Sequence, residues 1–135
     1  MAALSDYLED ALINWLRGTT FPAAPANVHI ALFTAAPSDA GGGTEVSGGS
    51  YARVAVSGAA GSWDAPSGGT GATENTAAIT FPAATASWGT VTHVGIFDAS
   101  TGGNLLFHGA LTESKAVGDG DTFEFAIGAL DLTFA

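Results

Sequence analysis

Hydrophobic residues near the start of the chain recur at every third or fourth position. Over residues 3–17 they are Leu4, Leu8, Ala11, Leu12, Trp15 and Leu16. This spacing predicts one amphipathic helix with an apolar face. Acidic residues in its early turns and Arg17 near its end suit the helix dipole, and Gly18 suits a helix end. The apolar face needs a partner, which is either the sheet of the same domain or a neighbouring subunit.

From residue 28 onwards the pattern changes to short apolar runs bounded by Gly, Pro, Asp or Asn. These runs predict about seven strands, at residues 28–33, 51–57, 77–81, 90–97, 105–111, 122–127 and 130–134. No helical pattern separates them, so we expect a mainly β fold, either an antiparallel β-sandwich or a partly closed barrel. Long loops are expected at residues 34–50 and 58–76.

The length of 135 residues predicts a single domain, with the helix in residues 1–18 and the β-sandwich in residues 28–134. Thirteen acidic and three basic residues give a net charge of −10, which argues against binding to nucleic-acid phosphates. Only 12% of residues are charged, which suits close contact with protein surfaces but also fits a composition rich in Ala and Gly. Neither a signal peptide nor a membrane-spanning run is present, so we expect no membrane insertion.

The residues that carry chemistry form no recognised catalytic or metal-binding motif. His29, His93 and His108 fall within predicted strands without ligand spacing, and the chain has no cysteine. Asp119 and Asp121 flank Gly120, which predicts a tight turn rather than a calcium site. We therefore expect no catalytic residue, cofactor or metal, and we interpret the histidines as structural.

Three segments carry a resemblance to a known family. They are TEVSGGSYAR at residues 44–53, WGTVTHVGIFD at residues 88–98 and GGNLL at residues 102–106. The chain resembles small tailed-bacteriophage virion proteins, often labelled phage tail fibre proteins, and the similarity covers nearly its whole length. The resemblance implies a non-enzymatic structural protein of the virion, assembled in the host cytoplasm.

Receptor-binding fibre proteins are commonly long and repetitive, whereas this chain is short and has no shaft. Within the virion class we therefore predict a capsid decoration or cement protein that bridges shell subunits. The alternatives are a tail fibre or tail-tip adsorption component that contacts the host surface, and a carbohydrate-binding module. Expected partners are the major capsid protein or tail proteins, and we expect a homo-oligomer such as a trimer. The predicted contact residues are Leu8, Leu12, Trp15, Glu45, Tyr51 and Trp63.

Overall fold

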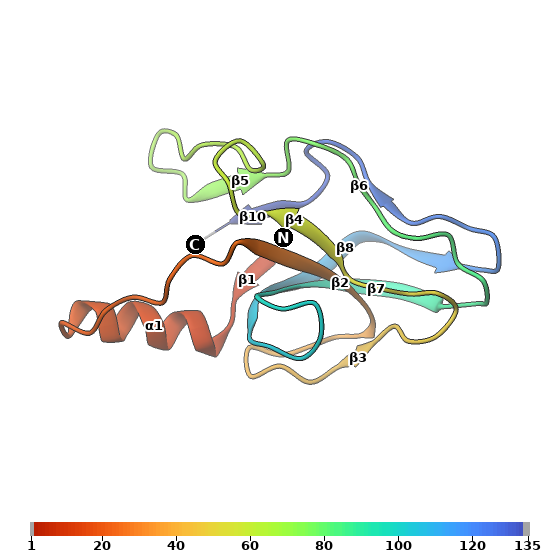
Figure 1. Ribbon diagram of the computed structural model, residues 1–135, viewed down its shortest axis with the longest axis horizontal. Coiled ribbons are helices and arrows are strands. Elements are labelled where there is room, and N and C mark those ends of the chain that lie inside the picture. Colours follow the sequence, from red (N-terminus) through yellow and green to blue (C-terminus); the bar gives the residue numbers. More distant parts are fainter. Residues whose placement is uncertain (1, 134–135) are drawn as a thin grey trace.

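The computed structural model describes residues 2–133 and shows a mainly β protein with one helix near its N-terminus (Figure 1). The helix is α1 (Asp6–Leu16). The strands are β1 (Ala2–Leu4), β2 (Asn27–Ala35), β3 (Thr44–Glu45), β4 (Val54–Ser57), β5 (Ala72–Glu74), β6 (Ile79–Thr80), β7 (Gly89–Phe97), β8 (Leu105–Val117), β9 (Glu124–Phe125) and β10 (Asp131–Thr133).

Most strands belong to one sheet, with the order β3-β2-β7-β8-β1-β10-β5, and β4 pairs with β2 beside β3. Strands β6 and β9 form a second, two-stranded sheet. Within residues 2–133, β1 and β10 pair in parallel and the other strand pairs are antiparallel. The predicted mainly β, antiparallel fold with an N-terminal helix is confirmed, and the described strands do not close into a barrel.

The main core lies between β2 and β7 of the large sheet and the small sheet. Ile30 and Leu32 of β2 are fully buried and belong to the same apolar cluster as the aromatic residues near β6 and β9. Among these, the rings of Phe81 and Phe123 lie 5.8 Å apart at a near-perpendicular angle. Such edge-to-face contacts add to the stabilisation that apolar burial already gives.

The opposite face of β2 and β7 carries a smaller apolar cluster. The rings of Phe33 and Phe97 are stacked with centroids 6.3 Å apart, and Gly95 lies beside them. A Cβ atom at Gly95 would lie 2.8 Å from Cε2 of Phe33, so only glycine allows the rings to approach the strand this closely. The second half of β7 therefore has apolar contacts on both faces, which agrees with the apolar run at residues 94–97.

The seven predicted strand positions each contain a strand, from β2 to β10, although residue 134 lies outside the described residues. The sequence pattern missed the short strands β1, β3 and β5. Strand β1 displaces the predicted start of the helix, because residues 2–4 pair with β8 before α1 begins at Asp6. The turn at Gly120 is confirmed, with the Asp121 amide donating to the Gly118 carbonyl.

Helix α1 extends beyond the end of the sheet, and the following chain runs back beside it to β2 (Figure 1). We call residues 6–26, which comprise α1 and this returning segment, the arm. From residue 12 to residue 24 every residue of the arm is exposed. The arm is therefore attached to the sheet at its base and open to solvent at its free end.

Candidate functional site

The base of the arm is fixed to the sheet by Ser5. Its amide and hydroxyl donate to the carbonyls of Leu106 and Leu105 in β8, and its hydroxyl also accepts the amide proton of Leu8. Ser5 is thus the N-cap of α1 and a link to β8 at the same time, and only 1% of it is exposed. This arrangement sets the direction in which the arm leaves the body.

The free end of the arm is a helix terminus closed by Gly18. Gly18 has a φ of +91°, and beside it the Thr19 amide donates to the Asn14 carbonyl. Glycine adopts this left-handed conformation without steric cost, so it ends the helix and lets the chain turn back. The predicted stop at Gly18 is confirmed.

The apolar face of α1 is covered only at its base. Leu8 packs against the main core and Ala11 is buried, but Leu12, Ile13, Trp15 and Leu16 are 44%, 57%, 62% and 81% exposed. Phe21 of the returning segment is also exposed. The first half of this face therefore packs on the same chain, as the first alternative expected, while its second half is exposed among residues 2–133, and contact with a neighbouring subunit stays a prediction.

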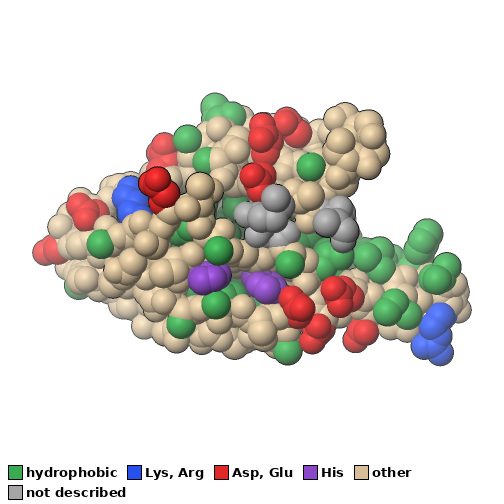
Figure 2. Space-filling model, turned by 180° about the vertical axis from the view of Figure 1, so that it is seen from behind, with side chains coloured by type: hydrophobic (Ala, Val, Ile, Leu, Met, Phe, Trp, Pro, Cys, Tyr) green, Lys and Arg blue, Asp and Glu red, His purple; other side chains and the backbone are tan. Residues whose placement is uncertain are grey.

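The exposed apolar residues lie next to an apolar groove. The groove encloses about 560 Å³ between α1, the returning segment and the sheet. Its lining includes Leu4, Leu8, Leu12, Phe21, Pro25 and Phe107. Figure 2 shows hydrophobic side chains along the projecting arm, where they meet solvent rather than the body of the protein. Because contiguous exposed apolar surface is typical of sites that contact other molecules, the arm and the groove are a candidate contact surface.

The six predicted contact residues fall into three separate places. Leu8, Leu12 and Trp15 belong to the arm, where Leu8 is half-buried and the other two are exposed. Trp15 is exposed because the helix extends beyond the end of the sheet (Figure 1). Ile13, Leu16 and Phe21 are also exposed on the arm but were not among the predicted contact residues, although Leu16 belongs to the predicted apolar face.

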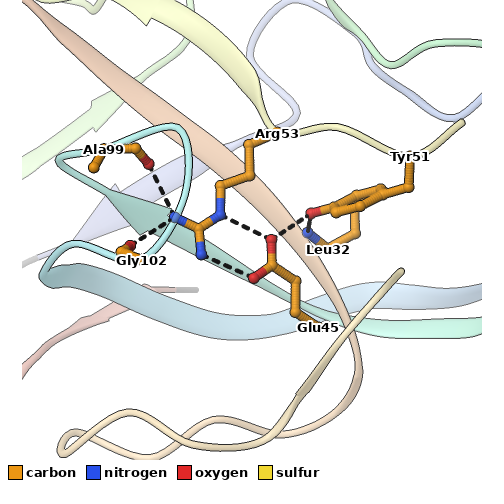
Figure 3. A network of polar contacts seen from close by, with 6 residues as sticks. All are labelled: Leu32, Glu45, Tyr51, Arg53, Ala99 and Gly102. Carbon is orange, nitrogen blue, oxygen red and sulfur yellow. Dashed lines mark hydrogen bonds and ion pairs between the residues drawn. The ribbon is translucent and has the colours of Figure 1, made fainter. Parts of the chain in front are cut away.

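Glu45 and Tyr51 lie together in a network of polar contacts (Figure 3). The Tyr51 hydroxyl donates to Oε1 of Glu45 over 2.9 Å and accepts the amide proton of Leu32. Arg53 donates to both carboxylate oxygens of Glu45 and, through Nη1, to the carbonyls of Ala99 and Gly102. This network joins β3, the segment before β4 and the turn between β7 and β8.

The electrostatics of the network favour an ionised Glu45. Burial alone raises the pKa of its carboxyl, but the hydrogen bonds from Arg53 and Tyr51, with the charge of Arg53, lower it below the usual value. Burial raises the pKa of the Tyr51 hydroxyl, so Tyr51 stays protonated. The guanidinium of Arg53 also lies 3.7 Å from the ring centroid of Phe97. These groups satisfy one another, which gives Glu45 and Tyr51 an internal structural role.

Trp63, the last of the six predicted contact residues, lies apart from the others in the long loop that includes β5. It makes an isolated bridge with Asn75 and packs partly buried against the main core. Asn75 itself is buried, and its side chain donates to the carbonyls of Ala77 and Ala126 and accepts the amide proton of Leu130. Trp63 therefore lies under its loop rather than standing free at the surface.

The three histidines lie in β2, β7 and β8, as expected. His108 contacts Asp39 with 2.6 Å between Nε2 and Oδ1, and Nδ1 of His93 lies 2.8 Å from the Thr92 hydroxyl. Among residues 2–133 no three His, Asp or Glu side chains are gathered in a way that could hold a metal ion. Nor does this part of the chain include a helix with the length and hydropathy needed to cross a membrane.

The family model described as "Podophage GP4 fiber I protein gp80" matches residues 3–133. No curated protein matches the chain. The match covers nearly the whole sequence, in agreement with the resemblance to tail fibre proteins. It contradicts the predicted capsid decoration protein, since the family is one of fibre proteins, and it favours the tail fibre alternative. A phage fibre protein is a non-enzymatic component of the virion and associates with other tail or virion proteins.

Proposed function

The chain belongs to the podophage GP4 fiber I protein gp80 family, and on that premise we propose that it is a structural module held in the tail fibre by its arm. The exposed apolar residues of the arm and the adjoining groove form the assembly surface. The β-sheet body carries this surface and fixes its direction through Ser5. The exposed apolar surface of the arm supports a role in assembly with other tail or virion proteins.

The observation that carries this proposal is the exposure of the second half of the apolar face. Burying one Leu or Ile side chain contributes about 1.5–3 kcal/mol, so covering the end of the arm would stabilise an assembled fibre. The exposed side chains here are contiguous on one projecting element. Ile127, by contrast, is an exposed apolar residue that lies outside the arm.

The test compares phage particles that carry different variants of this chain. Replacing Trp15 and Leu16 with serine removes the two most exposed large apolar groups of the arm. We expect this variant to fold and to fall in copy number per virion by about tenfold, the effect of losing about 1.4 kcal/mol of binding. Copy number is measured by quantitative protein analysis of purified virions.

Ile127→Ser is the matched control, because it removes an exposed apolar side chain from another place. We expect this variant to enter virions at the wild-type level. Circular dichroism and thermal unfolding establish that both variants are folded. A folded double variant at the wild-type copy number would overturn the proposal.

A further inference from the structure

We propose that the arm surface is covered by the arm of a second copy of this chain, with the two helices antiparallel around a two-fold axis. The inference rests on the proposed function of the arm as the assembly surface. The molecule that covers the surface is then a second copy of this chain, in an antiparallel orientation.

The charges along the arm favour the antiparallel orientation. Asp6, Glu9 and Asp10 lie at the base of the arm, whereas residues 11–38 contain no acidic residue and Arg17 lies at the free end. Figure 2 shows a basic side chain near the end of the arm and acidic side chains nearer the body. Antiparallel arms bring Arg17 close to the acidic base of the partner, whereas parallel arms oppose acidic turns to each other.

The apolar shape of the arm is complementary to itself in this orientation. Trp15 and Leu16 project at the free end, and the groove of about 560 Å³ lies toward the base. From Leu8 to Leu16 the helix rises about 12 Å, at about 1.5 Å per residue, so each free end reaches the groove of its partner. Because each copy carries both the projecting end and a groove, a single two-fold axis allows both contacts at once.

The charge of the whole chain also favours contact through the arms. A net charge of −10 makes two bodies repel each other at short range. The arm projects from the body and carries its exposed apolar residues beyond the acidic base (Figure 1). Pairing through the arms keeps the bodies apart, and repulsion between exposed charges fades beyond about 8 Å at physiological ionic strength.

Cysteine cross-linking tests the orientation, since the natural chain contains no cysteine. Glu9→Cys places a thiol at the base and Thr19→Cys places one at the free end, both at exposed positions. We expect a mixture of the two variants to form a mixed disulfide dimer at least about fivefold more than either variant alone. Disulfide dimers formed mainly within each single variant would mean parallel arms and would overturn the proposal.

Charge reversal provides a second test in the full chain. Arg17→Glu is expected to raise the dissociation constant of the dimer by about fivefold at low salt, and adding Glu9→Arg should recover most of that loss. Sedimentation equilibrium measures both constants. The matched control is Lys115→Glu, which reverses the charge of an exposed residue outside the arm and should leave the dissociation constant unchanged. The side chain of Arg53 is buried, so reversing its charge would not be a comparable control.

The outcomes separate this inference from the proposed function. Suppose that the wild-type chain is a monomer and that the variant with both Trp15 and Leu16 replaced fails to enter virions. Another virion protein would then cover the arm. The second-copy proposal would then fail while the assembly role stands. A wild-type trimer would also overturn the two-fold pairing. A dimer whose double variant enters virions normally would instead reject the assembly role.

Discussion

Arg53 binds Glu45 through two hydrogen bonds, Nε to Oε1 and Nη2 to Oε2, each 2.8 Å long. The remaining nitrogen, Nη1, donates to two carbonyls of the turn between β7 and β8. Because one planar guanidinium makes all these contacts, it joins β3 and the segment before β4 to a turn that lies 46 to 49 residues further along the chain. The network therefore holds these loops together through hydrogen bonds and one ion pair.

Arg53→Lys should destabilise the fold by about 1–3 kcal/mol, because an ammonium group cannot reproduce the two-point contact and the carbonyl contacts together. Chemical denaturation measures the change. Arg17→Lys is the control, since Arg17 is exposed, and it should change stability by less than about 0.5 kcal/mol. Equal stabilities for Arg53→Lys and the wild type would contradict the proposed role of the network.

The lowered pKa of Glu45 predicts that the free energy of unfolding depends on pH in the acid range. The folded pKa lies below the ordinary value of 4.5, so Glu45 stabilises the fold above that pH and loses this contribution as the pH falls through the lowered pKa. The difference in unfolding free energy between the wild type and Glu45→Gln should therefore shrink below pH 4.5. Denaturation curves across the acid range measure it, and curves that stay parallel would refute the assignment.

Gly95→Ala should destabilise the protein by about 1–3 kcal/mol, because the new Cβ would overpack the cluster on the outer face of β7. It would lie 2.8 Å from Phe33 and 3.2 Å from Leu105 and Phe97. Gly118→Ala is the matched control, as its Cβ would meet only Asp121 at 3.5 Å. Thermal unfolding of the two variants should separate them clearly, and similar melting temperatures would argue against the close packing at Gly95.

Ser5→Ala should cost about 1–2 kcal/mol, since it removes the N-cap of α1 and the side-chain contact with β8. If the arms of two copies pair, the variant should also weaken self-association, because the arm loses its fixed direction. Ser100→Ala, in the exposed turn after β7, is the control and should affect neither property. Unfolding and sedimentation measurements on the same samples test both effects.

The helix and the main strands could be predicted because their signals are local. The three- and four-residue spacing from Leu4 to Leu16 indicates a helix face, and the apolar runs at residues 30–33 and 94–97 indicate the parts of β2 and β7 that are covered on both sides. The short strands β1, β3 and β5 carry no such signal, since two or three residues are too few to show a period. They become strands because long-range partners supply their hydrogen bonds.

The sequence by itself determined the fold class, the helix with its stop at Gly18, and the positions of β2, β7 and the first half of β8, whereas residues 112–117 of β8 were not predicted as strand. Only the tertiary structure decided which half of the helix face is covered, because that depends on where Ser5 meets Leu105, one hundred residues away. The same holds for Glu45 and Tyr51, whose contact with Arg53 turns predicted surface residues into an internal network. Periodicity records what one segment prefers, whereas exposure depends on which distant segments pack against it.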